Sequence, residues 1–154
     1  MKIIFLDVDG VLNNARWAQK MYNEGVHVYA DDLLYDPAIK QLKRLIDATD
    51  AKVILSSSWR NYPDAMKHLA TQLAAYDIFI YGVTPNVGPQ RGDDISEWLA
   101  NHPVDNYVIL DDDSDMTVHM DHLVQTSYET GLQYTHVDQA IALLNGEAQN
   151  GNRT

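Results

Sequence analysis

Apolar residues in this chain gather in short runs that alternate with segments of helical spacing. A run such as Lys2-Ile-Ile-Phe-Leu6 has too few residues for a helix and is bounded by polar residues, which is typical of a buried strand. Five runs of this kind predict strands at residues 2–6, 52–55, 78–81, 106–110 and 122–126.

Between these runs, apolar residues recur at the three- and four-residue spacing of amphipathic helices. Asp36 and Pro37 are suited to the start of one helix, because Asp caps helices and Pro favours their first turn. Similar spacing predicts helices at residues 63–75, 93–100 and 137–144.

Strands that alternate with helices predict an α/β fold with a central parallel sheet of about five strands. We expect one domain over residues 1–146. Residues 13–35 follow neither period and contain several aromatic residues, and we interpret them as a flap or lid, a hairpin plus a loop. Residues 147–154 are polar and rich in Gly and Asn, and we expect a disordered tail.

Composition excludes several classes of protein. The chain has no cysteine, so disulfides and cysteine metal sites are excluded. No apolar run approaches the 18 residues of a membrane span, and the N-terminus lacks the pattern of a signal peptide, so we expect a cytoplasmic protein. The net charge of −11 argues against extended nucleic-acid binding, which needs Lys and Arg, but not against binding of a nucleic-acid end.

Acidic residues follow two of the predicted strands. Asp7 and Asp9 end the first strand, and Asp111 and Asp112 end the fourth. Because parallel strands point the same way, their carboxyl ends share one edge of the sheet, where ligands bind in such folds. Carboxylates with few other ligands suit Mg²⁺. The sequence therefore predicts a magnesium site at this edge.

Other polar residues are predicted at the same edge. Ser56-Ser57-Ser58 follows the second strand, and Arg91-Gly92 precedes a helix. Hydroxyl groups and a guanidinium suit phosphate oxygens. Together with the acids, they indicate phosphoryl transfer.

These motifs, in this order over residues 1–115, resemble the haloacid dehalogenase-like (HAD) superfamily of phosphohydrolases. Its first motif is an apolar strand followed by Asp-x-Asp, which Asp7-Val-Asp9-Gly10 fits. The segment Leu55-Ser-Ser-Ser-Trp-Arg60, with Arg91-Gly-Asp-Asp-Ile95, more narrowly resembles HAD domains associated with RNA-repair proteins. The resemblance implies a three-layer Rossmann-like fold and a phosphatase.

The resemblance implies roles for the acids. Asp7 would be the nucleophile that forms an aspartyl-phosphate, and Asp9 the general acid and base. Mg²⁺ would be held by the Asp7 carboxylate, the Asp9 carbonyl and Asp112, with Asp111 orienting the metal's water shell or Arg91.

It also implies substrate contacts. Ser57 would bind the phosphoryl oxygens, although Ser56 is a direct competitor. Arg91 would neutralise charge on the phosphoryl group. Further candidates for substrate binding are Gly10, Ser58 and Arg60. Trp59 could stack on a nucleobase or belong to the core.

The gaps between motifs are too short for a large cap domain, so we expect an open site. Such a site admits a phosphorylated small molecule, a nucleotide or a nucleic-acid end. The alternative from another class is a phosphoacceptor or binding module with slow or no turnover. A receiver-like module fits poorly, because its acids would be adjacent after the first strand, whereas Asp7 and Asp9 alternate.

Overall fold

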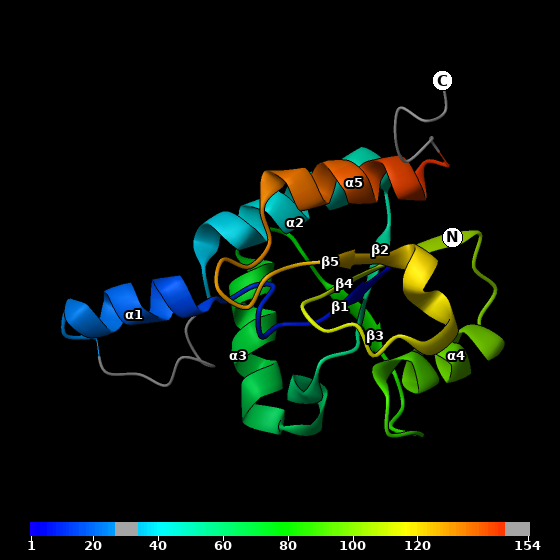
Figure 1. The fold of residues 1–154 in the computed structure, drawn as a ribbon, viewed down its shortest axis with the longest axis horizontal. Coiled ribbons are helices and arrows are strands. Elements are labelled where there is room, and N and C mark those ends of the chain that lie inside the picture. The colour runs from blue at the N-terminus through cyan, green and yellow to red at the C-terminus, as the bar shows by residue number, and fades with distance from the viewer. Residues whose placement is uncertain (27–33, 147–154) are drawn as a thin grey trace.

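Five parallel strands form a single sheet in the order β3-β2-β1-β4-β5. The structure is a computed structural model that describes residues 1–26 and 34–146. Figure 1 shows the sheet running through the middle of the molecule, with helices on both sides. The strands are β1 (Lys2–Leu6), β2 (Lys52–Leu55), β3 (Ile80–Val83), β4 (Asn106–Asp111) and β5 (Leu123–Gln125).

Helices cover both faces of this sheet, which confirms the predicted three-layer, Rossmann-like α/β fold. One face packs on α2 (Asp36–Thr49), α3 (Pro63–Ala74) and α5 (Tyr134–Leu144). The other packs on α4 (Arg91–Ala100). Short 3₁₀ helices η2 (Ser58–Asn61) and η3 (Thr117–His122) follow β2 and precede β5.

The central strand β1 explains why its sequence is apolar without alternation. Ile4 and Leu6 belong to the core beneath α2, α3 and α5, whereas Ile3 and Phe5 belong to the core beneath α4. Successive side chains of a strand point to opposite faces, so a strand covered on both faces needs apolar residues at every position. Asp7, which follows, continues this alternation toward the α4 side.

Most predicted elements are present with shifted ends. Strand β3 begins two residues later than predicted, at Ile80, and α5 begins three residues earlier, at Tyr134. Helix α4 begins at Arg91 rather than at residue 93. Side-chain caps explain the two helix starts, because Gln90 and Gln133 each form a reciprocal capping pair with the first helical turn.

The hairpin predicted within residues 13–35 is wrong. Residues Ala15–Asn23 form a helix, α1, which extends away from the sheet (Figure 1). Its start is set by Asn14, whose side-chain oxygen accepts a hydrogen bond from the Trp17 backbone N–H at 2.7 Å. Helix α1 fully buries none of its residues. Its apolar residues Trp17, Ala18 and Met21 keep helical spacing, but its 9 residues are fewer than the roughly 11 over which periodicity identifies a helix. Residues 27–33 of the expected lid and the expected tail, 147–154, lie outside the described residues.

Nothing in the described part of the chain forms a cap domain, which agrees with the prediction from the short gaps between motifs. Within the same residues, none of the helices has both the length and the apolar character needed to cross a membrane.

The start of α4 is pressed against the loop that follows β4. The backbone N–H of Gly92 donates to the Asp115 carbonyl at 3.0 Å, and the Arg91 N–H donates to the Asp115 carboxylate at 3.1 Å. A Cβ atom on Gly92 would lie 2.3 Å from the Met116 carbonyl oxygen. Only glycine therefore permits this contact between the helix and the loop.

We predict that Gly92→Ala destabilises the protein. In an unobstructed helix this change would stabilise by about 1 kcal/mol, but the contact with the Met116 backbone should instead reduce the free energy of unfolding by about 1–3 kcal/mol. Urea denaturation measures the difference. Glu97→Ala, at an exposed position of the same helix, serves as the control and should change stability by about 0.5 kcal/mol or less. A Gly92→Ala variant as stable as the unaltered protein would contradict the interpretation.

Candidate active site

Polar residues form a row across the carboxyl edge of the sheet. Leu6 of β1 is paired with Leu55 of β2 and Leu110 of β4. The residues that follow them, Asp7, Ser56 and Asp111, therefore lie side by side and face the same side of the sheet. The pairing of Leu55 with Val83 extends the row to Thr84.

Three carboxylates meet in this row. Asp7, Asp111 and Asp112 each place one carboxylate oxygen within 4.8 Å of the others. The two strand ends predicted to deliver acids to a common position thus do so. Asp7 and Asp111 are buried, and Asp112 is half-buried.

Burial and mutual repulsion raise the pKa values of these acids. Burial raises the pKa of Asp7 to about 6, against the opposing effect of the Arg91 charge. Burial, and then the negative charge of Asp7, raise the pKa of Asp111 to about 9. The pKa of Asp112 is raised as well, chiefly by burial. Carboxylates arranged in this way need either shared protons or a cation between them.

Gly10 makes room for Asp112. Its φ of +80° lies in the left-handed region, and a Cβ atom there would lie 2.3 Å from a carboxylate oxygen of Asp112. The Thr126 hydroxyl donates to the Gly10 carbonyl at 2.6 Å and fixes this turn. Gly10 was predicted to contact substrate. In the structure, its missing side chain leaves the space that the Asp112 carboxylate occupies.

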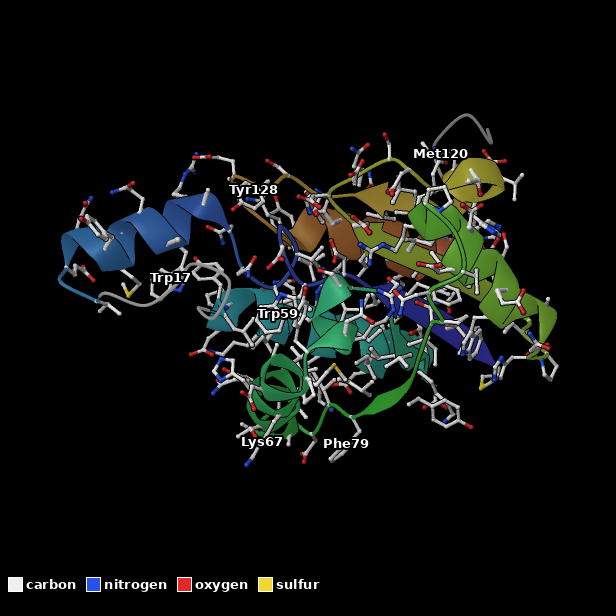
Figure 2. All side chains as sticks on the ribbon, turned by 90° about the horizontal axis from the view of Figure 1, so that it is seen from below. Trp17, Trp59, Lys67, Phe79, Met120 and Tyr128 are labelled. Atoms are coloured by element: carbon white, nitrogen blue, oxygen red, sulfur yellow. The ribbon has the colours of Figure 1, made fainter. Side chains whose placement is uncertain are left out.

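Asp9 is held by two side-chain donors. Its Oδ1 atom accepts from the Asn13 amide at 2.9 Å and from the Trp59 indole N–H at 3.1 Å. Trp59 is 5% exposed and lies near the middle of the molecule (Figure 2), so it belongs to the core and does not present its ring to a nucleobase. Both donors restrict the position of the Asp9 carboxylate.

The three serines after β2 have different surroundings. Ser56 and Ser57 are fully buried, whereas Ser58 is exposed. The Ser57 hydroxyl accepts from the Trp59 backbone N–H at 3.1 Å and caps η2. The Ser56 hydroxyl has no hydrogen-bond partner among the described residues, although it lies in the same row as Asp7.

Arg91 is the first residue of α4 and lies on the face to which Asp7 points. Its positive charge acts on both Asp7 and Asp111, since it opposes the rise of their pKa values. Its Nη1 atom is buried and, within residues 1–26 and 34–146, has no hydrogen-bond partner. A buried, unpaired guanidinium nitrogen beside carboxylates is suited to an anionic ligand.

Arg60 has a structural role instead of the predicted contact with substrate. Its side chain is 4% exposed and forms an ion pair of 2.9 Å with Asp94, itself 8% exposed. A guanidinium has five N–H groups, and Arg60 has at least as many acceptors: the carbonyls of Ser56, Ser57, Thr84 and Pro85 and the side chains of Asn86 and Asp94. No N–H remains for a substrate, and Arg60 instead holds the serine loop against the end of β3.

Unpaired buried polar atoms gather at this edge. Five such side-chain atoms occur in the described part of the chain, and four are Ser56 Oγ, Thr84 Oγ1, Arg91 Nη1 and Asp111 Oδ2. Buried polar atoms are nearly always hydrogen-bonded in folded proteins. Four exceptions along one sheet edge indicate a position where a ligand completes the hydrogen bonding.

Comparison with known proteins agrees with this geometry. The chain matches the family described as "HAD domain in Swiss Army Knife RNA repair proteins" over residues 3–137. The chain belongs to this family. Its superfamily is one of phosphohydrolases, and the predicted narrower resemblance to RNA-repair HAD domains is confirmed. Searches of curated proteins and of solved structures found no significant match.

Several residues that organise the site were not predicted from the sequence. Asn13, Thr126, Thr84 and Asp94 had no predicted role, yet the first two fix the turn after Asp7 and Asp94 anchors Arg60. Asn13 had a detectable signal, because it is an amide residue directly after the apolar pair Val11-Leu12 and four residues after Asp9. The other three act through contacts between distant parts of the chain, which no local pattern indicates.

We predict that Asp94→Ala strongly destabilises the protein. Removing one partner of a buried ion pair leaves the Arg60 charge uncompensated, which should lower the free energy of unfolding by about 3–5 kcal/mol. Chemical denaturation measures it. Asp138→Ala is a matched control, because its 2.9 Å pair with Arg44 is exposed and should contribute about 1 kcal/mol or less. Equal losses in the two variants would refute a buried anchoring role for Asp94.

Proposed function

We propose that this protein is a Mg²⁺-dependent phosphatase that hydrolyses a phosphomonoester through an aspartyl-phosphate on Asp7. The observation that carries the proposal is the cluster of Asp7, Asp111 and Asp112 within 4.8 Å, bordered by unpaired Ser56 and Arg91 atoms. An acidic cluster beside unpaired donors suits a cation and the phosphate that it neutralises. Membership of a phosphohydrolase superfamily supports the same conclusion.

The residues present fit a magnesium ion. Mg²⁺ prefers oxygen ligands, and the three acids offer only oxygens. The unpaired Oδ2 atom of Asp111 and the raised pKa values of Asp7 and Asp111 indicate that Arg91 compensates the negative charge of this cluster only in part, which favours a bound cation. When bound, the ion would offset the charge of substrate and nucleophile.

Asp7 is suited to be the nucleophile. Its carboxylate would attack phosphorus and form an acyl-phosphate while the ester oxygen departs. Asp9 would give a proton to that oxygen and then take a proton from the water that hydrolyses the intermediate. The Asn13 and Trp59 donors on one oxygen of Asp9 support this role, because they hold the group in one position.

Ser56 and Arg91 would bind the phosphoryl oxygens. Ser56 is favoured over Ser57, because the Ser57 hydroxyl already caps η2 whereas that of Ser56 lacks a partner among the described residues. Ser58, exposed beside them, stays a prediction for substrate binding. The family description supports a phosphorylated end of a nucleic acid, or a nucleotide, as substrate.

We predict that Asp7→Asn abolishes hydrolysis of a generic aryl phosphate, because an amide cannot attack phosphorus. The rate should fall by about 10³-fold or more, and removal of Mg²⁺ by a chelator should abolish turnover of the unaltered protein. Asp113→Asn, at an exposed acid outside the cluster, should change little. Turnover that survives Asp7→Asn would refute the mechanism. A stable phosphorylated protein with no turnover would instead support a phosphoacceptor module.

The two serines give a separate prediction. Ser56→Ala should lower kcat/KM by about 10²-fold, as expected for loss of a donor to developing negative charge, with little change in stability. Ser57→Ala should mainly lower the free energy of unfolding, by about 1 kcal/mol, because it removes a cap. Steady-state kinetics and denaturation of both variants distinguish these effects. The reverse pattern would assign phosphate binding to Ser57.

A further inference from the structure

A hollow lies at the base of α1, outside the acidic cluster. It has a volume of about 460 Å³, within the range of small-molecule sites. Its wall comes from α1, from the start of α2 and from the segment that leads into α5. The lining residues used below are Asn14, Arg16, Trp17, Lys20, Tyr35 and Leu132.

The charge of this hollow is opposite to that of the protein. The chain carries 22 acidic and 11 basic residues, yet the described lining includes Arg16 and Lys20 and no carboxylate. Arg16 is 72% exposed, and its ion pair with Glu129, at 3.9 Å, is also exposed. Such a pair contributes little, so both cations are accessible to an anionic ligand.

Aromatic rings supply the other half of the wall. The rings of Trp17 and Tyr35 have centroids 5.0 Å apart and are tilted by 48°, and Lys20 Nζ lies 5.8 Å from the Trp17 ring. The Trp17 indole nitrogen is buried and is the fifth unpaired polar atom among the described residues. A hydrogen-bond acceptor on a ligand bound beside Trp17 would satisfy this atom. Figure 2 shows Trp17 at α1, well apart from Trp59.

The hollow and the acidic cluster are joined by one short turn. Asn13 donates to the Asp9 carboxylate at 2.9 Å, and the next residue, Asn14, lines the hollow. Tyr35 and Leu132, two further lining residues, donate backbone hydrogen bonds to the carbonyls of Leu12 and Val11. The hollow therefore borders the same turn, residues 11–14, that carries a donor to Asp9.

We propose that this hollow binds the base and a phosphate of a nucleotide unit of the substrate. The aromatic residues would stack on the base, the Trp17 N–H would donate to it, and Arg16 and Lys20 would bind a phosphate oxygen. The assignment rests on the proposed function, because it names the substrate class of the same site. A nucleotide explains the rings, the cations and the unpaired donor together, whereas a sugar phosphate leaves the rings unused.

Direct binding tests this assignment without requiring turnover. Calorimetry would measure the Kd of a nucleoside monophosphate, of ribose 5-phosphate and of a short oligoribonucleotide with a terminal phosphate. The variants are Trp17→Ala and Lys20→Glu. The matched controls are Phe79→Ala, exposed just before β3, and Lys67→Glu, exposed on α3 (Figure 2). Helix α1 buries no residue, so neither variant at the hollow should prevent folding.

Each variant at the hollow should raise the Kd of the nucleotide by about tenfold or more, and the controls should not. Ribose 5-phosphate should bind more weakly and be insensitive to Trp17→Ala. Tighter binding of the oligoribonucleotide would assign the hollow to the end of a chain, and tighter binding of the monophosphate to a free nucleotide; both support the proposal if the variants weaken binding. Nucleotide binding unaffected by Trp17→Ala and Lys20→Glu would overturn it.

Hydrolysis of an aryl phosphate separates this proposal from the previous one. Lys20→Glu should leave that rate unchanged while it lowers kcat/KM for the phosphorylated oligoribonucleotide, which has further phosphates besides the one that is hydrolysed. If no phosphate ester is hydrolysed but Trp17→Ala and Lys20→Glu weaken nucleotide binding, the proposed phosphatase activity is wrong and the proposed nucleotide site is supported. If the aryl phosphate is hydrolysed and both variants bind nucleotide as tightly as the unaltered protein, the proposed nucleotide site is wrong and the proposed phosphatase activity is supported.

Discussion

Repulsion among carboxylates at the end of two buried strands is the constraint on which the rest of the site depends. Asp7, Asp111 and Asp112 lie within 4.8 Å of one another, and two of them are buried. The positive charge of Arg91 reduces this repulsion. Gly10 leaves space for the Asp112 carboxylate. The arrangement favours a cation, since acids this close are otherwise stable only with shared protons.

The sequence predicted the features that follow from strand direction alone. The apolar runs identified all five strands, and parallel pairing then required Asp7 and Asp111 to emerge at the same edge. Leu6 and Leu110 are paired in register, so the residues that follow them, Asp7 and Asp111, are neighbours. A shift of the pairing by one residue would separate these two acids. Such positions can be derived from local patterns, since the period of a strand determines both the pairing and the face.

Roles that depend on distant partners could not be derived in this way. Arg60 resembled a ligand-binding residue from its place beside the serines, and only the fold shows that Asp94 and backbone carbonyls occupy its donors. Trp59 is separated by 50 residues from the Asp9 carboxylate to which it donates. Helix α1 was missed because its 9 residues are too few for its apolar spacing to be distinguished from irregular chain.

Helix α1 contributes no buried residue to the core, and it is attached to the sheet through the turn that begins after Asp7. Substitutions on its surface are therefore nearly free of the stability costs that restrict β1 or α2. Evolution can alter this helix in related proteins while the reaction chemistry persists, so relatives with the same acids are expected to differ first in the shape of their α1 segment. If α1 binds the substrate as proposed, substrate preference and the proposed phosphate chemistry would then diverge at separate rates along one chain.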